Sequence, residues 1–459
     1  MKPVYLAPLV LATAAAVSLL LRTEAALPVD PKFTATDPGP RGGADAGAPL
    51  PNLTPGQLAL FNAGKDEFTT VQAIPDGLGP RMNLNSCSGC HTQPTTGGTS
   101  PRTNPQVAFA TLEGATNAIP PFISLYGPVR EARFVRNPDG SPDGGVHNLF
   151  TIQGRSDAPG CQLAQPNFAA ALAADNVIFR IPTPVFGAGL IELIPDSAII
   201  ANQASNAAAK RVLGIHGRPN IVLNGHAISG QPNLNGNDGT AARFGWKAQN
   251  KSLLLFAGEA YNQEMGITNE LFQTERDETP TCQYIAQPND TTDSEAQTPI
   301  DALSATEKFA FFMRFLAPPK PSPNFPGGAA SITKGLTLFG AVGCIHCHTP
   351  ALRTVPSTVV AALADQPVNL YSDLLLHDMG VGLADGVSQG QAGPREFRSA
   401  PLWGLGQRLF FLHDGRTSDL RVAIEQHRSS GSEANTVVLH FDQLAEPDKQ
   451  HLLNFLRSL

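Results

Sequence analysis

Apolar residues recur at helical spacing in three segments of the chain. Residues 53–61 contain, after Leu53, Thr54, which can cap a helix, and Pro55, which suits the first helical position. Residues 331–342 and 441–459 each place their large apolar side chains close to one helical face. We therefore predict a helix in each of these segments.

The stretch from about residue 100 to residue 327 has a different pattern. Short β-branched and apolar runs, such as 177–182 and 221–223, alternate with turns that contain Gly and Asn. Gly and Pro make up about 18% of the chain, above the usual level of roughly 12%, but hydrophobic residues at 42% are too many for disorder. We predict a mainly α fold with irregular loops and some short strands.

The first 26 residues have the pattern of a secretory signal peptide. Lys2 precedes an almost wholly apolar run from Val4 to Leu21, and the small-residue stretch 23–26 follows as a cleavage region. We expect a periplasmic or otherwise exported protein in which residues 27–52, rich in Pro, Gly, Asp and Ala, form a flexible leader. An uncleaved N-terminal anchor is the alternative, because the apolar run approaches the length that spans a bilayer.

The charge balance excludes one class of partner. The chain has 32 Lys and Arg against 39 Asp and Glu, a formal net charge of −7, and its basic residues are evenly spread. A nucleic-acid-binding protein would need a basic face. We expect no nucleic-acid partner, and no membrane span beyond the N-terminal segment.

Four of the six cysteines lie in two copies of the pattern C-x-x-C-H. The copies are Cys87-Ser88-Gly89-Cys90-His91 and Cys344-Ile345-His346-Cys347-His348. This is the attachment signal of a c-type haem: the two thiols form thioethers to the vinyl groups, and the histidine that follows ligates the iron. The sequence therefore predicts two covalently bound haems, with His91 and His348 as proximal ligands.

Two other sites could use such cysteines. Both pairs could share one tetrahedral zinc ion, or each pair could be a redox dithiol. Neither alternative explains why a histidine follows at once in both copies, and export favours haem. The remaining cysteines, Cys161 and Cys282, are expected to form a disulfide in an oxidising compartment, with two free thiols as the alternative.

The motifs also suggest how the chain is divided. A helix before the motif and another at the end of the chain is how a small cytochrome c domain encloses its haem. We predict two cytochrome c-type domains: an N-terminal one at 53–327, enlarged by a loop-rich insertion, and a C-terminal one at 328–459.

The sequence resembles a family of di-haem oxidoreductases grouped with peroxidases and also called thiol oxidoreductases. The resemblance covers nearly everything from Leu53 to Leu459, and more distantly extends to bacterial di-haem cytochrome c peroxidases. The segments that carry it are 184–192, 243–248, 264–269, 376–380, 398–405 and 412–416.

The resemblance implies roles for individual residues. His91 would hold the iron that reacts with the oxidant, and His348 the iron that receives electrons. Trp246 would carry electrons between the haems, and Glu264 would act as acid and base on the peroxide. The implied partners are a small electron-donor protein or cytochrome, and hydrogen peroxide or oxygen. Calcium is familiar in the peroxidases, but no ligand cluster in this sequence identifies it.

The sixth ligand predicted for the second iron differs from the one in the peroxidases, which is a methionine. A helix predicted to start at Asp419 places Leu420, Ile424 and His427 on one face. We predict His427 as the ligand and keep Met379 as the alternative. An imidazole in place of a thioether should lower the reduction potential of that haem.

The sixth position of the first iron is open to several interpretations. The peroxidases commonly have a histidine some sixteen residues after their first motif, and this chain has none between His91 and His147. The face is either open or filled by His147, His216 or His226. The same scaffold could also serve a di-haem electron-transfer cytochrome without catalysis, or an oxygenase or protein-modifying enzyme.

Overall fold

The computed structural model describes residues 33–42, 45–221, 226–228, 231–233, 240–322 and 324–459, without the side chains of 226–228 and 231–233. The predicted signal peptide, 1–26, and the first part of the predicted leader lie outside these residues. The description that follows concerns Ala35–Leu459, which forms one compact unit. Among the described residues, no helix is both long enough and apolar enough to cross a bilayer.

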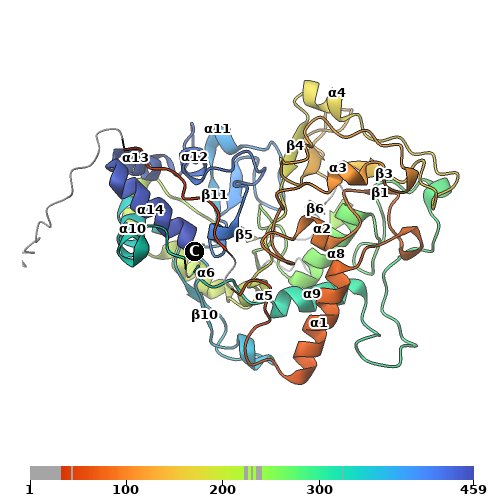
Figure 1. The fold of residues 1–459 in the computed structure, drawn as a ribbon, viewed down its shortest axis with the longest axis horizontal. Helices are drawn as coiled ribbons and strands as arrows, with labels where there is room; N and C mark the ends of the chain where they lie inside the picture. The colour runs from red at the N-terminus through yellow and green to blue at the C-terminus, as the bar shows by residue number, and fades with distance from the viewer. Residues whose placement is uncertain (1–32, 43–44, 222–225, 229–230, 234–239, 323) are drawn as a thin grey trace, which may run out of the picture. The chain divides into compact units, whose positions relative to one another are not determined.

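Two groups of packed helices organise this unit (Figure 1). In the first, α1 (Pro55–Thr69) packs along α9 (Ala305–Phe315), and α8 (Leu253–Met265) lies against α9. The approach of α1 to α9 requires Gly64, because a Cβ atom there would lie 2.2 Å from the carbonyl oxygen of Lys308. Thr54 and Gln57 cap α1 reciprocally, as its sequence predicts, and the helix extends beyond residue 61 to Thr69.

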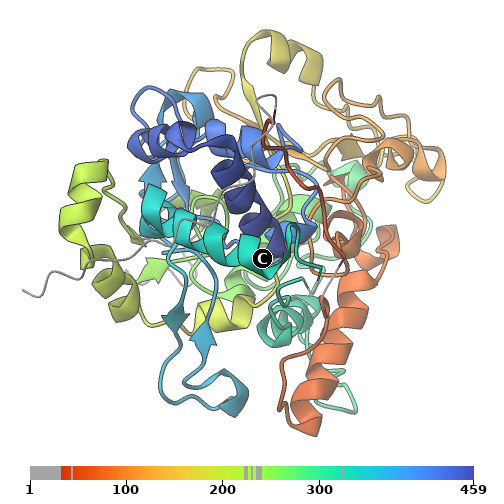
Figure 2. The same cartoon turned by 60° about the vertical axis from the view of Figure 1, so that its left-hand side comes forward.

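The second group pairs α10 (Gly328–Val342) with α14 (Glu446–Ser458), and α13 (Asn435–Gln443) lies beside α10. Figure 2 shows both helix pairs, the cyan α10 against the dark blue α14 and the orange-red α1 next to α9. Gly335 permits the contact in the second pair, because a Cβ atom there would lie 2.1 Å from the carbonyl oxygen of His451.

The prediction of a single helix over residues 441–459 is wrong, because the structure has two helices there. The segment contains the end of α13 and all of α14, and Leu444 and Ala445 between them have extended backbone. Pro447 explains the break, since proline fits the first turn of a helix but cannot continue one.

The remaining helices are short and lie among loops. They are α2 (Cys87–Cys90), α3 (Gln106–Phe109), α4 (Phe168–Ala173), α5 (Ala188–Glu192), α6 (Asp196–Ala204), α7 (Ala207–Leu213), α11 (Gly380–Leu383) and α12 (Leu420–Glu425). Asp419 caps α12 with its side chain, so this helix starts one residue later than predicted.

The strands form two-stranded antiparallel pairs. The pairs are β1 (Arg81–Met82) with β3 (Phe150–Thr151), β2 (Glu131–Phe134) with β4 (Val177–Arg180), β5 (Asn220–Ile221) with β8 (Ala241–Ala242), β6 (His226–Ile228) with β7 (Gln231–Asn233), β9 (Leu352–Arg353) with β10 (Pro367–Val368), and β11 (Leu376–Asp378) with β12 (Glu396–Arg398). The prediction of a mainly helical fold with short strands and loops is therefore confirmed. Strand β4 matches the start of the run 177–182, whereas Val222 and Leu223 lie outside the described residues.

Each C-x-x-C-H motif borders its own buried apolar cluster. Phe61, Phe68 and Phe312 belong to the cluster around α1 and α9, against which Cys87 and Cys90 pack. A second cluster around α10, α13 and α14 contacts the other motif. The two motifs therefore lie in different hydrophobic surroundings.

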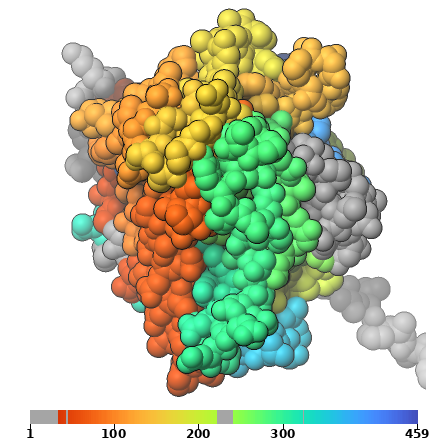
Figure 3. Space-filling model, turned by 90° about the vertical axis from the view of Figure 1, so that its right-hand side faces the viewer, coloured from red at the N-terminus to blue at the C-terminus, as the bar shows by residue number. Residues whose placement is uncertain are grey.

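Two further contacts join distant parts of the chain. Cys161 and Cys282 form a disulfide, which confirms that prediction. In the segment predicted as a flexible leader, Asp37 accepts two hydrogen bonds of 2.6 Å from the buried guanidinium of Arg457. Figure 3 shows a face formed mainly by the early part of the chain, coloured red to yellow, and by a green segment from its middle.

Candidate haem centres

The first motif opens onto a cavity with about 1150 Å3 of space that no protein atom fills. Part of this space is open to solvent, and it lies directly beside the motif, where a haem would have to bind. Cys87, Cys90 and His91 line the cavity, and neither cysteine forms a disulfide. Ser86 caps the single turn that carries them by accepting a hydrogen bond of 3.2 Å from the amide of Gly89.

The ring of His91 is oriented by the backbone. Its Nδ1 lies 3.0 Å from the carbonyl oxygen of Gly98, so Nε2 is the nitrogen left to ligate a metal, although the backbone of Thr183 also interacts with the ring. Burial lowers the pKa of His91 to about 4, so the imidazole is neutral, as a ligand must be. The residue type, its tautomer and the space beside it therefore fit a haem.

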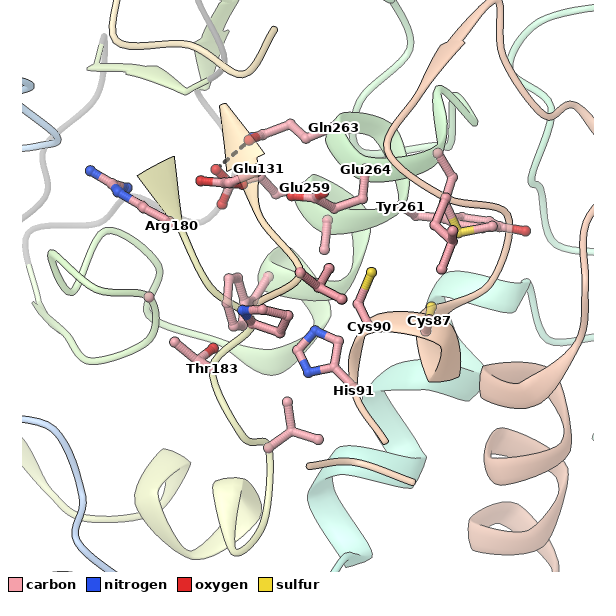
Figure 4. Close-up of a pocket in the computed structure, with 18 of the residues that line it drawn as sticks. Cys87, Cys90, His91, Glu131, Arg180, Thr183, Glu259, Tyr261, Gln263 and Glu264 are labelled. Atoms are coloured by element: carbon pink, nitrogen blue, oxygen red, sulfur yellow. Dashed lines mark hydrogen bonds between the residues drawn. The ribbon is translucent and has the colours of Figure 1, made fainter. Parts of the chain in front are cut away.

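An acidic wall faces His91 across the cavity. Figure 4 shows Glu131, Glu259 and Glu264 grouped on one side of the cavity and His91 on the other. Glu131 comes from β2, and Glu259 and Glu264 come from α8. The pairing of β2 with β4 places Arg180 directly opposite Glu131.

Glu131 and Glu264 are joined by a hydrogen bond between their side chains, but their surroundings differ. Asn83 donates a hydrogen bond of 2.7 Å to Oε2 of Glu264, whereas Oε1 of Glu131 accepts one of 2.6 Å from Nε of Arg133. Burial, and then the charge of Glu131, raise the pKa of Glu264 well above its usual value. Despite burial, which acts in the opposite direction, the Arg133 guanidinium lowers the pKa of Glu131. The pair therefore holds one proton, on Glu264, and one negative charge, on Glu131.

Gln263 connects the third carboxyl of this wall to the pair. It donates a hydrogen bond of 2.6 Å to Glu259 and accepts one of 3.2 Å from Nη2 of Arg133. Burial raises the pKa of Glu259. Glu131, Arg133 and Glu259 carry no motif in the sequence, because only the register of β2 against β4 and the packing of α8 bring them to the cavity.

The second motif opens onto another cavity, with about 1410 Å3 of unfilled space. Cys344, Cys347 and His348 line it, and so does His427, just past the end of α12. Nδ1 of His348 lies 3.0 Å from the carbonyl oxygen of Tyr371, and Nδ1 of His427 lies 2.7 Å from that of Ala423. Both rings thus leave Nε2 available, the same arrangement as at His91.

The two candidate iron ligands of the second cavity, His348 and His427, are also neutral at physiological pH. Burial, and then the charge of His427, lower the pKa of His348 to about 4, and burial lowers the pKa of His427. Met379, the alternative sixth ligand, lines the same cavity. The structure therefore brings both candidate ligands to the motif, and the donor set fits a haem.

Trp246 lies between the two centres. Among the described residues, Trp246 is the one that lines both the first and the second cavity. Its indole Nε1 donates a hydrogen bond of 2.9 Å to the carbonyl oxygen of Ile181, which fixes the ring. An edge contact with centroids 6.4 Å apart leads to His413, which stacks on Phe397 at 4.3 Å in the wall of the second cavity.

The histidines proposed for the far side of the first iron lie elsewhere. His147 stacks on Phe134 and bonds Asp143 at 2.7 Å, and His216 is exposed. The side chain of His226 lies outside the described residues. Among the described residues that line the first cavity, His91 is the sole histidine.

The arrangement of the cysteines bears on the zinc alternative. The two pairs line different cavities, so the four thiols do not converge on one ion. In the described part of the chain, no group of three or more His, Cys, Asp or Glu side chains is arranged to hold a metal ion.

Comparison with known proteins identifies one family. A model of the family described as "Di-haem oxidoreductase, putative peroxidase" matches residues 131–459. The match includes Glu131, Trp246, Glu264 and the second motif, and it begins after the first motif. No curated protein matches the chain.

Two solved structures are similar to parts of the fold. A hydrazine synthase from Kuenenia stuttgartiensis is 18% identical over 35% of this chain and 56% of that chain, with a TM-score of 0.22. This chain therefore spans little more than half of that relative. A variant of a diheme peroxidase from Burkholderia thailandensis is 14% identical over 93% of this chain and 91% of that chain, with a TM-score of 0.30.

Proposed function

The chain belongs to the family of di-haem oxidoreductases, and we propose that it is an exported enzyme that passes electrons from one c-type haem to a second, where peroxide is reduced. The family establishes that it is an oxidoreductase. We further propose this direction of electron transfer and the covalent attachment of both haems. The division of the chain into two domains at 327/328 and the export of the protein are also proposed.

The difference between the two cavities carries this proposal. The first has one histidine among its described lining residues and a wall of carboxyl groups. The second is lined by four described histidines, of which His377 pairs with Glu433 and His413 stacks on Phe397, so that His348 and His427 remain as the two candidate ligands. A centre with one histidine keeps a face for a small oxidant, whereas a centre with two is suited to electron transfer. The first cavity is therefore proposed as the reaction site and the second as the entry point for electrons.

When bound, the haems supply the one-electron chemistry and the metal site for the oxidant. The chain supplies protons and orientation. Reducing one hydrogen peroxide to two waters takes two electrons and two protons, and Glu264 is placed to hold a proton in the first cavity at neutral pH. Glu131 stays ionised beside Arg133, so it can accept the hydrogen bond that keeps the Glu264 carboxyl group in position.

At the second centre, His348 and His427 would hold the iron, with Met379 as the alternative to His427. A small electron-donor protein or cytochrome would reduce this centre. Trp246 would then carry electrons toward the first cavity, as its position in both linings supports.

The proposal is tested on the purified holoprotein in the ferric and reduced states. We expect two haems per chain, one high-spin ferric signal, carbon monoxide binding by one reduced haem, and steady-state reduction of peroxide with a reduced small cytochrome. A protein with two low-spin haems that binds no carbon monoxide would instead be an electron-transfer cytochrome.

A further inference from the structure

A third, smaller cavity of about 570 Å3 shares lining residues with both candidate haem centres. Trp246 lines all three cavities. The third cavity also shares two arginines, Arg398 and Arg408, with the second cavity.

Neither arginine is paired with an acid among the described residues. Arg398 donates only to backbone carbonyls, from Nε to Gly245 at 3.0 Å and from Nη1 to Ser399 at 3.5 Å. Arg408 donates from Nη2 to the carbonyl of Pro401 at 3.0 Å, and its buried Nε has no partner. In the described part of the chain, no carboxylate forms an ion pair with either guanidinium.

Other buried arginines of this protein do have acid partners. Arg133 pairs with Glu131, Arg180 with Asp385, and Arg457 with Asp37. A buried charge without a counter-charge is unfavourable, and an arginine does not escape this by losing its proton. Burial lowers the pKa of Arg398 and Arg408 only to about 10, so both remain charged at neutral pH.

The counter-charge must therefore come from whatever fills the cavity. The other charged residues of the second cavity, His377 and Glu433, already pair with each other at 2.9 Å. A haem carries two propionate carboxylates, and the two arginines offer donors in the fork geometry that binds a carboxylate.

We propose that Arg398 and Arg408 bind the propionates of the haem held by Cys344, Cys347 and His348. This inference rests on the proposed function, because it requires that haem. Two positive charges beside the porphyrin favour the reduced iron. They would therefore offset part of the lowering of the potential that His427 causes as a ligand.

The test uses the holoprotein with Arg398→Gln and Arg408→Gln, and measures haem content, both reduction potentials and the propionate modes in the resonance Raman spectrum. We expect each variant to shift the propionate modes and to lower the potential of one haem. Arg243→Gln is the matched control, because Arg243 lines the same third cavity but pairs with Asp196. It should leave the propionate modes unchanged.

Conservative variants keep the test decisive where a glutamine variant loses its haem. Arg398→Lys and Arg408→Lys keep the charge but lose the fork, so we expect a retained haem with shifted propionate modes. Unchanged modes and potentials in all variants would overturn the inference. So would a wild-type potential that depends on chloride at constant ionic strength, because the arginines would then bind a small inorganic anion. A protein that lacks the second haem altogether would instead overturn the proposed function.

Discussion

Glu131 and Glu264 meet at the wall of the first cavity and share a hydrogen bond, although they come from a strand and a helix far apart in the sequence. Arg133 lies on one side of this pair and Asn83 on the other. The two carboxyl groups therefore have unequal pKa values: Glu264 holds the proton and Glu131 the charge. This inequality makes the roles of the two residues separable by experiment.

Replacing the carboxyl that holds the proton should slow peroxide reduction. We expect Glu264→Gln to lower turnover by roughly 10²- to 10⁴-fold, the usual contribution of an acid–base group, and to leave the haem content unchanged. Steady-state assays with a reduced cytochrome measure the rate. Glu295→Gln, at an exposed position, is the control and should behave as wild type. A wild-type rate in Glu264→Gln would remove this residue from the mechanism.

Replacing the charged partner should change the pH dependence instead. The charge of Glu131 raises the pKa of Glu264, so Glu131→Gln should lower that pKa. If the protonated form of Glu264 is active, the rate falls as pH rises through its pKa, and the alkaline limb of the kcat/KM profile should move to lower pH. An alkaline limb in the wild-type position would show that the pair does not control turnover.

The indole between the cavities should control electron transfer and not peroxide binding. We expect Trp246→Phe to slow electron transfer from the second haem to the first, because the ring that lines both cavities is shortened. Rapid-mixing spectroscopy of the half-reduced enzyme follows this step. The other tryptophan of the chain, Trp403, lines only the third of these cavities, so Trp403→Phe is the matched control. Equal rates in both variants would exclude Trp246 as the route.

Local signals in the sequence predicted much of the fold. Thr54 and Pro55 set the start of α1, and the C-x-x-C-H spacing identified the two motifs that open onto the large cavities. The family resemblance and the disulfide were also predicted and are confirmed. These features depend on neighbouring residues, on the number of cysteines left unassigned, or on motifs that are contiguous in the sequence.

Features that depend on long-range pairing could not be predicted. Glu131 and Arg133 lie on a four-residue strand without a motif, and only its register against β4 turns them to the cavity. The carbonyl groups of Gly98 and Tyr371, which orient His91 and His348, carry no side-chain signal at all. Backbone groups and tertiary register therefore complete sites whose metal-binding residues the sequence already indicates.

The disulfide should contribute to stability without affecting the haems. It joins Cys161 and Cys282 across a separation of 121 residues, and we expect Cys161→Ser with Cys282→Ser to lower the free energy of unfolding by about 2–5 kcal/mol. Urea unfolding followed by the far-ultraviolet signal measures it. Mild reduction of wild type is the matched control, because the proposed thioether bonds to haem would resist it. The prediction fails if the double variant unfolds at the wild-type urea concentration.

The identity of the sixth ligand at the second centre can be decided between His427 and Met379. Nδ1 of His427 is bonded to the carbonyl of Ala423, so Nε2 is presented at a fixed position. We expect His427→Met to raise the potential of this haem, within the span of roughly 0.8 V that axial ligands set, and His427→Ala to make it high-spin. Met379→Leu should change neither. If Met379→Leu instead produces the high-spin signal while His427→Ala stays low-spin, the thioether is the ligand. The haem would then be expected to have the higher potential of a His–Met centre.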